Sequence, residues 1–197
     1  MQGSKIRLSD AEQELFANAE VILTKNSILQ KTMQLLNEVQ ENLLMESSFN
    51  ENHFTSSPKI SKGENYLGLP YVVLDYPRIS KGDNLLFIRS FFWWGNFFSS
   101  TLQVSGNYKE NCSHTLKAAF NQLSDQNYFI GVNEHPWVHH FGEDNYASIQ
   151  SLSKQDFVTI LDNLPHTKIA AHWPLSDWDS AANKLIKSWK VLAELVS

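Results

Sequence analysis

Apolar residues recur at helical spacing over the first quarter of the chain. They lie three or four positions apart behind Ser9 and Glu12, which have the form of a capping box. The polar run 24–27 interrupts the pattern. It predicts either two helices, roughly 10–23 and 26–46, or one long helix with a bend.

The central part of the chain carries short apolar runs bounded by Gly, Pro, Asn and Asp, which is typical of strands and turns. Turn residues fill 77–84, and helical spacing returns over 113–123 and after Ser153. Strands are predicted over 69–76, 85–94, 97–104, 128–132, 146–152 and 167–173.

An aromatic cluster dominates the segment 91–98, where six of eight residues are Phe or Trp. One unbroken strand over 85–104 would be roughly 65 Å long, more than the ~40 Å width of a domain of this size. The chain is therefore predicted to fold back at Gly95 and Asn96. A two-residue turn there places Trp94 opposite Phe97.

These elements predict one α+β domain with a twisted antiparallel sheet of about five or six strands, and with helices mainly on one face. Along the chain we expect a helical segment over 9–46, a flexible loop over 47–58, a sheet-rich body over 59–175 and a C-terminal helix over 177–196.

Composition places the chain among ordinary globular proteins, with 42% hydrophobic and 19% charged residues. Its net charge of −5 argues against binding to nucleic acid or to acidic lipid surfaces, both of which require a basic face. No apolar stretch approaches the ~18 residues of a membrane span. We expect neither nucleic acid nor membrane as a partner.

Cys112 is the only cysteine, so the chain cannot form an internal disulfide. No signal peptide is apparent, and the predicted location is the cytoplasm. A nucleophilic Cys112 with His114 nearby is one interpretation. The simpler one is a small, partly buried residue near a helix start.

Arg89 is the one charged residue on a strand face that it shares with Phe91 and Trp93. An isolated guanidinium in an apolar layer is costly, so Arg89 must be paired. Asp75 and Glu64 are candidate internal partners, and a bound carboxylate or phosphate is the other option.

The opposite face of the predicted hairpin combines aromatic rings with hydroxyl and amide groups, which suits either a ligand pocket or the underside of a helix. The segment 63–71, which is rich in Gly, Tyr and Pro, is predicted to cap one end of the sheet or to form a pocket rim. The candidate ligand-binding residues are Arg89, Arg78, Trp94, Phe97 and Tyr71.

Three histidines and three carboxylates lie within 133–144. Imidazole and carboxylate groups ligate zinc and iron, which makes His135, His139 and His140 weak candidates for a metal site. The spacing matches no established metal motif, and no metal is favoured. Polar loop histidines are the simpler interpretation.

The sequence contains neither a Gly-x-Ser-x-Gly elbow nor a glycine-rich nucleotide loop. Three functional hypotheses follow, with the cofactor unknown. The first is a domain that binds a small anionic or aromatic ligand beside the aromatic hairpin. The second is an interaction or structural protein, such as a homodimer, that uses this hairpin. The third is a metal-dependent hydrolase built on the histidine-rich segment.

Overall fold

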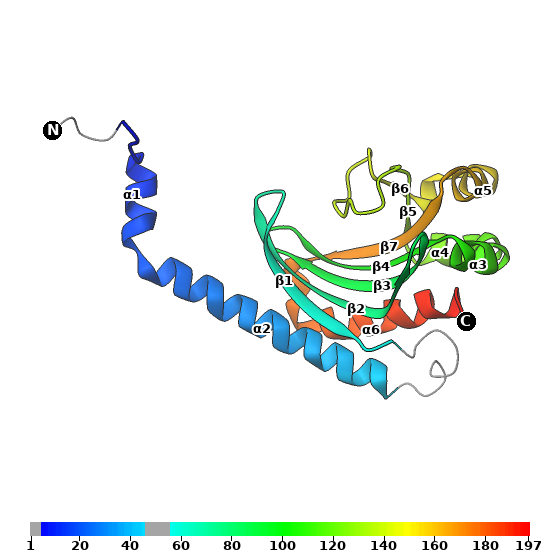
Figure 1. The fold of residues 1–197 in the computed structure, drawn as a ribbon, viewed down its shortest axis with the longest axis horizontal. Coiled ribbons are helices and arrows are strands. Elements are labelled where there is room, and N and C mark those ends of the chain that lie inside the picture. Colours follow the sequence, from blue (N-terminus) through cyan, green and yellow to red (C-terminus); the bar gives the residue numbers. More distant parts are fainter. Residues whose placement is uncertain (1–4, 46–55) are drawn as a thin grey trace.

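The computed structural model describes residues 5–45 and 56–197. These residues form a single α+β domain in which helices flank a twisted antiparallel sheet (Figure 1), so the predicted fold class is confirmed. The sheet has seven strands rather than five or six, in the order β1-β2-β3-β4-β7-β5-β6. Most of the predicted flexible loop, 47–55, lies outside the described residues.

All neighbouring strands pair antiparallel. The strands are β1 (Lys59–Tyr66), β2 (Leu69–Lys81), β3 (Asn84–Trp93), β4 (Phe97–Ser105), β5 (Phe129–Gly131), β6 (Tyr146–Ser148) and β7 (His166–Pro174).

The helices are divided between one face and one end of the sheet (Figure 1). They are α1 (Asp10–Ala17), α2 (Ala19–Leu44), α3 (Asn107–Ala118), α4 (Phe120–Asp125), α5 (Lys154–Asn163) and α6 (Trp178–Glu194). Helices α2 and α6 run along one face, while α3, α4 and α5 gather near one end.

The break between the first two helices lies at Asn18, not in the polar run 24–27, so the predicted boundary is wrong. Asn18 has an extended backbone, and its side chain accepts the N–H of Glu20 at 3.0 Å. It therefore ends α1 and caps α2, whereas the polar run faces outward along a continuous helix. The predicted capping box of Ser9 and Glu12 is confirmed.

Strand β1 was not predicted, because its sequence 59–66 is polar and lacks the apolar run of a strand. It is the edge strand of the sheet that the described residues form, where polar residues are well tolerated. The turn predicted over 77–84 is shorter than expected, because β2 continues to Lys81 and only residues 82 and 83 form the turn. Pro77 fits because it lies in a bulge of the ladder, where no N–H is required.

The hairpin of β3 and β4 is confirmed, but its predicted register is off by one residue. Trp93, not Trp94, lies opposite Phe97, so the turn has three residues, 94–96. Trp94 lies outside the β3–β4 pairing, with its ring packed against that of Phe92 and its backbone N–H donating to Pro70 O at 3.0 Å. Because side chains alternate along a strand, this shift exchanges the two faces of β4.

The main core lies between the sheet and helices α2 and α6. Leu36, Phe98 and Leu185 are completely buried there, and the ring of Trp189 stacks on that of Tyr76. A smaller apolar cluster on the opposite face of the sheet contains Val73, Phe91 and Trp93. The segment 132–145 covers this second face. Within the described residues, no helix is both long and apolar enough to cross a membrane.

Candidate functional site

A cavity of about 330 Å³ lies between strands β1 to β3 and the segment 132–145, on the face of the sheet opposite α2 and α6. Its wall combines aromatic rings, an ion pair, and the hydroxyl groups of serine and tyrosine side chains. Its lining residues are Ser61, Tyr66, Tyr71, Val73, Asp75, Arg89, Phe91, Trp137 and His139.

Arg89 and Asp75 form a two-pronged ion pair at the base of this cavity. The strand register places them directly opposite each other on β3 and β2. Arg89 Nε donates to Asp75 Oδ1 at 2.7 Å, and one terminal nitrogen donates to Oδ2 at 2.9 Å. Their side chains are only 18% and 9% exposed. Of the two internal partners considered, Asp75 is therefore the one found, while Glu64 pairs with Lys25 at 2.5 Å.

His139 lies on the other side of the guanidinium, with Nε2 2.9 Å from Arg89 Nη1. Arginine has only donors, so His139 Nε2 must accept this hydrogen bond and the ring proton must be on Nδ1. Burial, followed by the positive charges of Arg89 and Lys168, lowers the pKa of His139 to about 3. The imidazole is therefore neutral at physiological pH.

The hydrogen bonds leave donors available for a ligand. A guanidinium has five N–H groups. The hydrogen bonds of Arg89 to described residues use three of them. Tyr66 Oη accepts the backbone N–H groups of His139 at 2.6 Å and His140 at 3.1 Å, so its own proton can be donated elsewhere. The cavity thus has no net charge and presents N–H and O–H donors that the described residues leave unused.

Aromatic rings form most of the remaining wall. Phe91 lies with its ring centroid 5.8 Å from those of both Tyr66 and Tyr71. The Trp137 ring stands 5.9 Å from the central carbon of the Arg89 guanidinium and is 41% exposed, which places it at the rim. Flat apolar walls beside a few polar groups are typical of sites for small molecules.

The segment 132–145 is held over the sheet by buried polar contacts. Lys168, on β7, donates to Val138 O at 2.8 Å and to Asn145 Oδ1 at 2.9 Å. It is fully buried, and this burial lowers its pKa to about 8. Gly131 makes room for it, because a Cβ there would lie 2.8 Å from Lys168 Cε. These contacts fix the position of His139 and Trp137 above Arg89.

The structure places two of the five predicted ligand-binding residues, Arg89 and Tyr71, in the cavity wall. Phe97 lies half-buried on the same face but does not line the cavity, and its ring centroid is 5.5 Å from that of Trp93. Trp94 is half-buried against the main core on the other face.

Arg78 is exposed on β2, opposite Phe87. It lies on the Arg89 side of the sheet but does not line the cavity. The predicted set is therefore divided among the cavity, its surroundings and the opposite face.

Each of the three candidate metal-binding histidines has a different partner. His139 Nε2 binds Arg89, and His140 Nε2 lies 3.0 Å from Asp144 Oδ1. His135 Nδ1 accepts the N–H of Trp137 at 3.3 Å. No group of three metal-ligating side chains comes together within residues 5–45 and 56–197.

Cys112 lies on α3 and is buried in the main core. Burial raises the pKa of its thiol to about 11, so the sulfur stays protonated and is a poor nucleophile. His114 faces outward on the same helix. The placement agrees with the simpler interpretation of this residue.

Sequence reasoning did not single out Tyr66, Trp137 or Ser61 as cavity residues. Tyr66 belongs to the segment 63–71, which the sequence predicts to cap the sheet or to form a pocket rim. The β1–β2 pairing brings it beside Tyr71. Trp137 gave no periodic signal, because it lies in an irregular segment whose position depends on tertiary contacts.

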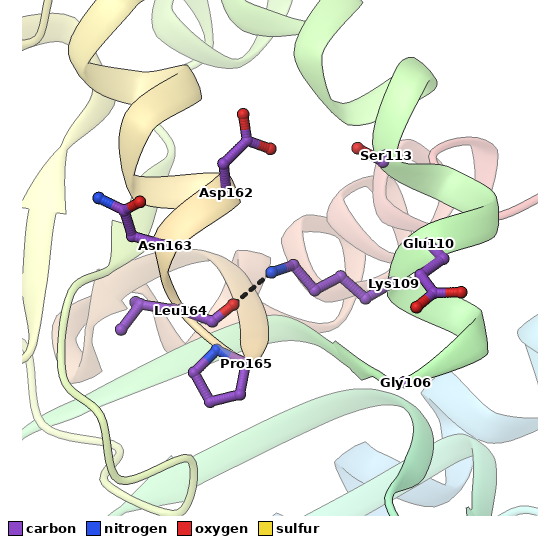
Figure 2. Close-up of a pocket in the computed structure, with 8 residues that line it drawn as sticks. All are labelled: Gly106, Lys109, Glu110, Ser113, Asp162, Asn163, Leu164 and Pro165. Carbon is purple, nitrogen blue, oxygen red and sulfur yellow. Dashed lines mark hydrogen bonds between the residues drawn. The ribbon is translucent and has the colours of Figure 1, made fainter.

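A larger hollow, about 480 Å³, lies between the start of α3 and the end of α5. Figure 2 shows Lys109 reaching across it to donate to the carbonyl oxygen of Leu164, with Asp162 and Glu110 around it. Lys109 thereby satisfies a free carbonyl at the end of a helix, which is a structural role. This hollow lacks the aromatic walls of the first one.

No family model, no curated protein and no solved structure matches this chain.

Proposed function

We propose that this protein binds a small planar aromatic molecule with a hydrogen-bond acceptor in the cavity beside Arg89. The observation that carries the proposal is the combination, in one cavity, of aromatic walls with the unused donors of a partly buried guanidinium. The single buried thiol is compatible with a reducing compartment, and the cytoplasm remains the expected location.

The charge balance favours an aromatic ligand over a simple anion. Asp75 already neutralises Arg89, so a bare anion would be attracted only by the N–H groups that remain. An aromatic ring would also contact Tyr71 and Phe91 and release water from their surfaces. Carbonyl and carboxylate oxygens are both suitable acceptors for the donors.

The proposal is for binding, not catalysis. His139 is neutral, but the lone pair of its Nε2 already accepts from Arg89 and is not free to remove a proton from a ligand. Ser61 is the one serine that lines the cavity. Among the described residues, its hydroxyl has no hydrogen bond to a side chain that could act as a base. A nucleophile and its base should lie within hydrogen-bond distance.

Thermal unfolding with three probes tests this proposal. Benzoate and its neutral analogue benzamide are expected to raise the Tm of the wild type, because both have a ring and an acceptor. Inorganic phosphate is expected to leave the Tm unchanged. A Tm that responds to phosphate alone would replace the proposed ligand class with a simple anion, and no response to any probe would contradict the proposal.

A rim variant locates the binding. Trp137→Ala removes one wall, and because this side chain is 41% exposed the fold should persist. We expect at least a tenfold weaker apparent affinity for benzoate, or ~1.4 kcal/mol. Met45→Ala is the matched control, since Met45 is 80% exposed at the far end of α2. Equal affinity of both variants would place the binding elsewhere.

A further inference from the structure

The N-terminal helices carry an exposed apolar surface that the body of the protein leaves uncovered. We define the arm as residues 10–24, that is α1 and the first turns of α2, and every residue in it is exposed. It projects away from the sheet (Figure 1). Helix α1 has no buried residue at all. The large apolar side chains of the arm are Leu15 and Phe16 on α1 and Val21, Ile22 and Leu23 on α2. They are exposed by 58%, 85%, 41%, 55% and 66%, respectively.

The arm continues a stripe that is buried farther along the same helix. Leu29, Leu36 and Leu43 are spaced seven residues apart and are at most 5% exposed, packed beneath the sheet and beside α6. Ile22 is the preceding member of this series, but more than half of it is exposed. A seven-residue repeat is the pattern by which one helix packs against another. On the arm, no other element of the described chain buries this pattern.

We propose that the arm is a dimer interface whose occupant is the arm of a second copy of this chain. From their exposed fractions, the five side chains present an apolar area on the order of 500 Å² per copy. A standard interface buries ~800 Å² per partner, of which roughly 60% is apolar. The exposed apolar area of the arm is thus similar to what one partner contributes to a standard interface.

The charges of this region are compatible with such a pairing. The arm itself contains Asp10, Glu12, Glu14 and Glu20 and no basic residue, whereas Lys25 and Lys31 follow it on α2. A twofold antiparallel pairing of the two arms, centred near Asn18, brings Asp10 and Glu12 of each copy toward the partner's Lys25. The same acidic residues would be repelled by an anionic lipid surface.

The oligomeric mass in solution tests the proposal, with a double variant to locate the contact. The full chain is expected to show twice its monomer mass by light scattering, with a concentration-dependent equilibrium. Phe16→Glu combined with Ile22→Glu should weaken the dimer by roughly 100-fold or more, because two apolar anchors become charged. Met45→Glu, a charge on an exposed residue at the other end of α2, should retain the dimer.

The remaining outcomes each contradict the proposal. A monomeric wild type at high concentration would show that no second copy binds. A double variant that keeps the wild-type dimer mass would place the interface elsewhere. Sedimentation of a monomeric wild type with phosphatidylserine vesicles would make the arm a lipid-binding segment instead. Thermal unfolding of the double variant serves as the folding control, since none of its substituted side chains is buried.

Discussion

At the scale of single residues, the ion pair of Asp75 and Arg89 is the clearest test of what holds the cavity together. Its side chains are mostly shielded from water, so Asp75→Ala leaves a guanidinium without its counter-charge. We expect the free energy of unfolding to fall by about 3 kcal/mol, measured by urea denaturation. Glu64→Ala, which breaks the more exposed pair with Lys25, is the control and should cost less than about 1 kcal/mol. Equal losses would mean that Arg89 is solvated in the folded protein.

His139 makes the stability depend on pH in a definite direction. Its pKa is about 3 in the folded protein, against 6.5 for an unperturbed histidine. Between these values the unfolded chain binds a proton that the folded chain does not, so stability falls as the pH is lowered through this window. His139→Gln should reduce the slope of the free energy of unfolding between pH 6 and 4 by about 1 kcal/mol per pH unit. An unchanged slope would contradict a buried, neutral His139.

At the scale of elements, the segment 132–145 depends on the hydroxyl of Tyr66. Tyr66→Phe leaves the backbone N–H groups of His139 and His140 without their acceptor, at a cost of roughly 1–3 kcal/mol. Hydrogen exchange followed by mass spectrometry should show faster exchange in 132–145. Tyr71→Phe changes the same kind of ring in the same cavity and should leave that exchange rate as it is. Slow exchange in both variants would mean that other contacts hold the segment.

The β3–β4 hairpin shows how far the sequence predicts an element and where prediction ends. Aromatic density and chain length were enough to predict that the chain folds back near Gly95. They could not decide between a two-residue and a three-residue turn, because that depends on whether Trp94 joins the ladder or packs against the core. One residue of register then decided whether Phe97 lies on the cavity side or the helix side.

Gly95 is the residue of this turn that tolerates little change. Its φ of +71° is strained for a residue with a side chain, although the space around it is open. Gly95→Ala should therefore cost about 1 kcal/mol through the backbone alone, measured by chemical denaturation. Gly95→Asn should recover part of that loss, because asparagine adopts positive φ more readily than alanine. A neutral Gly95→Ala would contradict this turn geometry.

At the scale of the whole molecule, local patterns predicted the α+β class and the covering of one sheet face by helices. They did not predict the candidate site, because it joins parts that are far apart in sequence. Tyr66, Arg89 and His139 come from an edge strand, a central strand and an irregular segment. The strand order, the buried Lys168 and the hydroxyl of Tyr66 bring them together, and none of these is encoded in a local period.

Helix α2 has an exposed start, which belongs to the arm, and a buried remainder, which belongs to the main core. One substitution in each part shows how differently they contribute to stability. Leu36→Ala opens a cavity in the completely packed core and should lower the free energy of unfolding by about 2–5 kcal/mol. Ile22→Ala changes the same stripe two heptads earlier, where the side chain is 55% exposed. In dilute, monomeric protein it should cost less than about 0.5 kcal/mol, since little burial is lost and alanine favours the helix. Calorimetry of both variants measures the difference. A large loss for Ile22→Ala would mean that the arm packs against its own body in solution, which would also remove the surface proposed for the second copy.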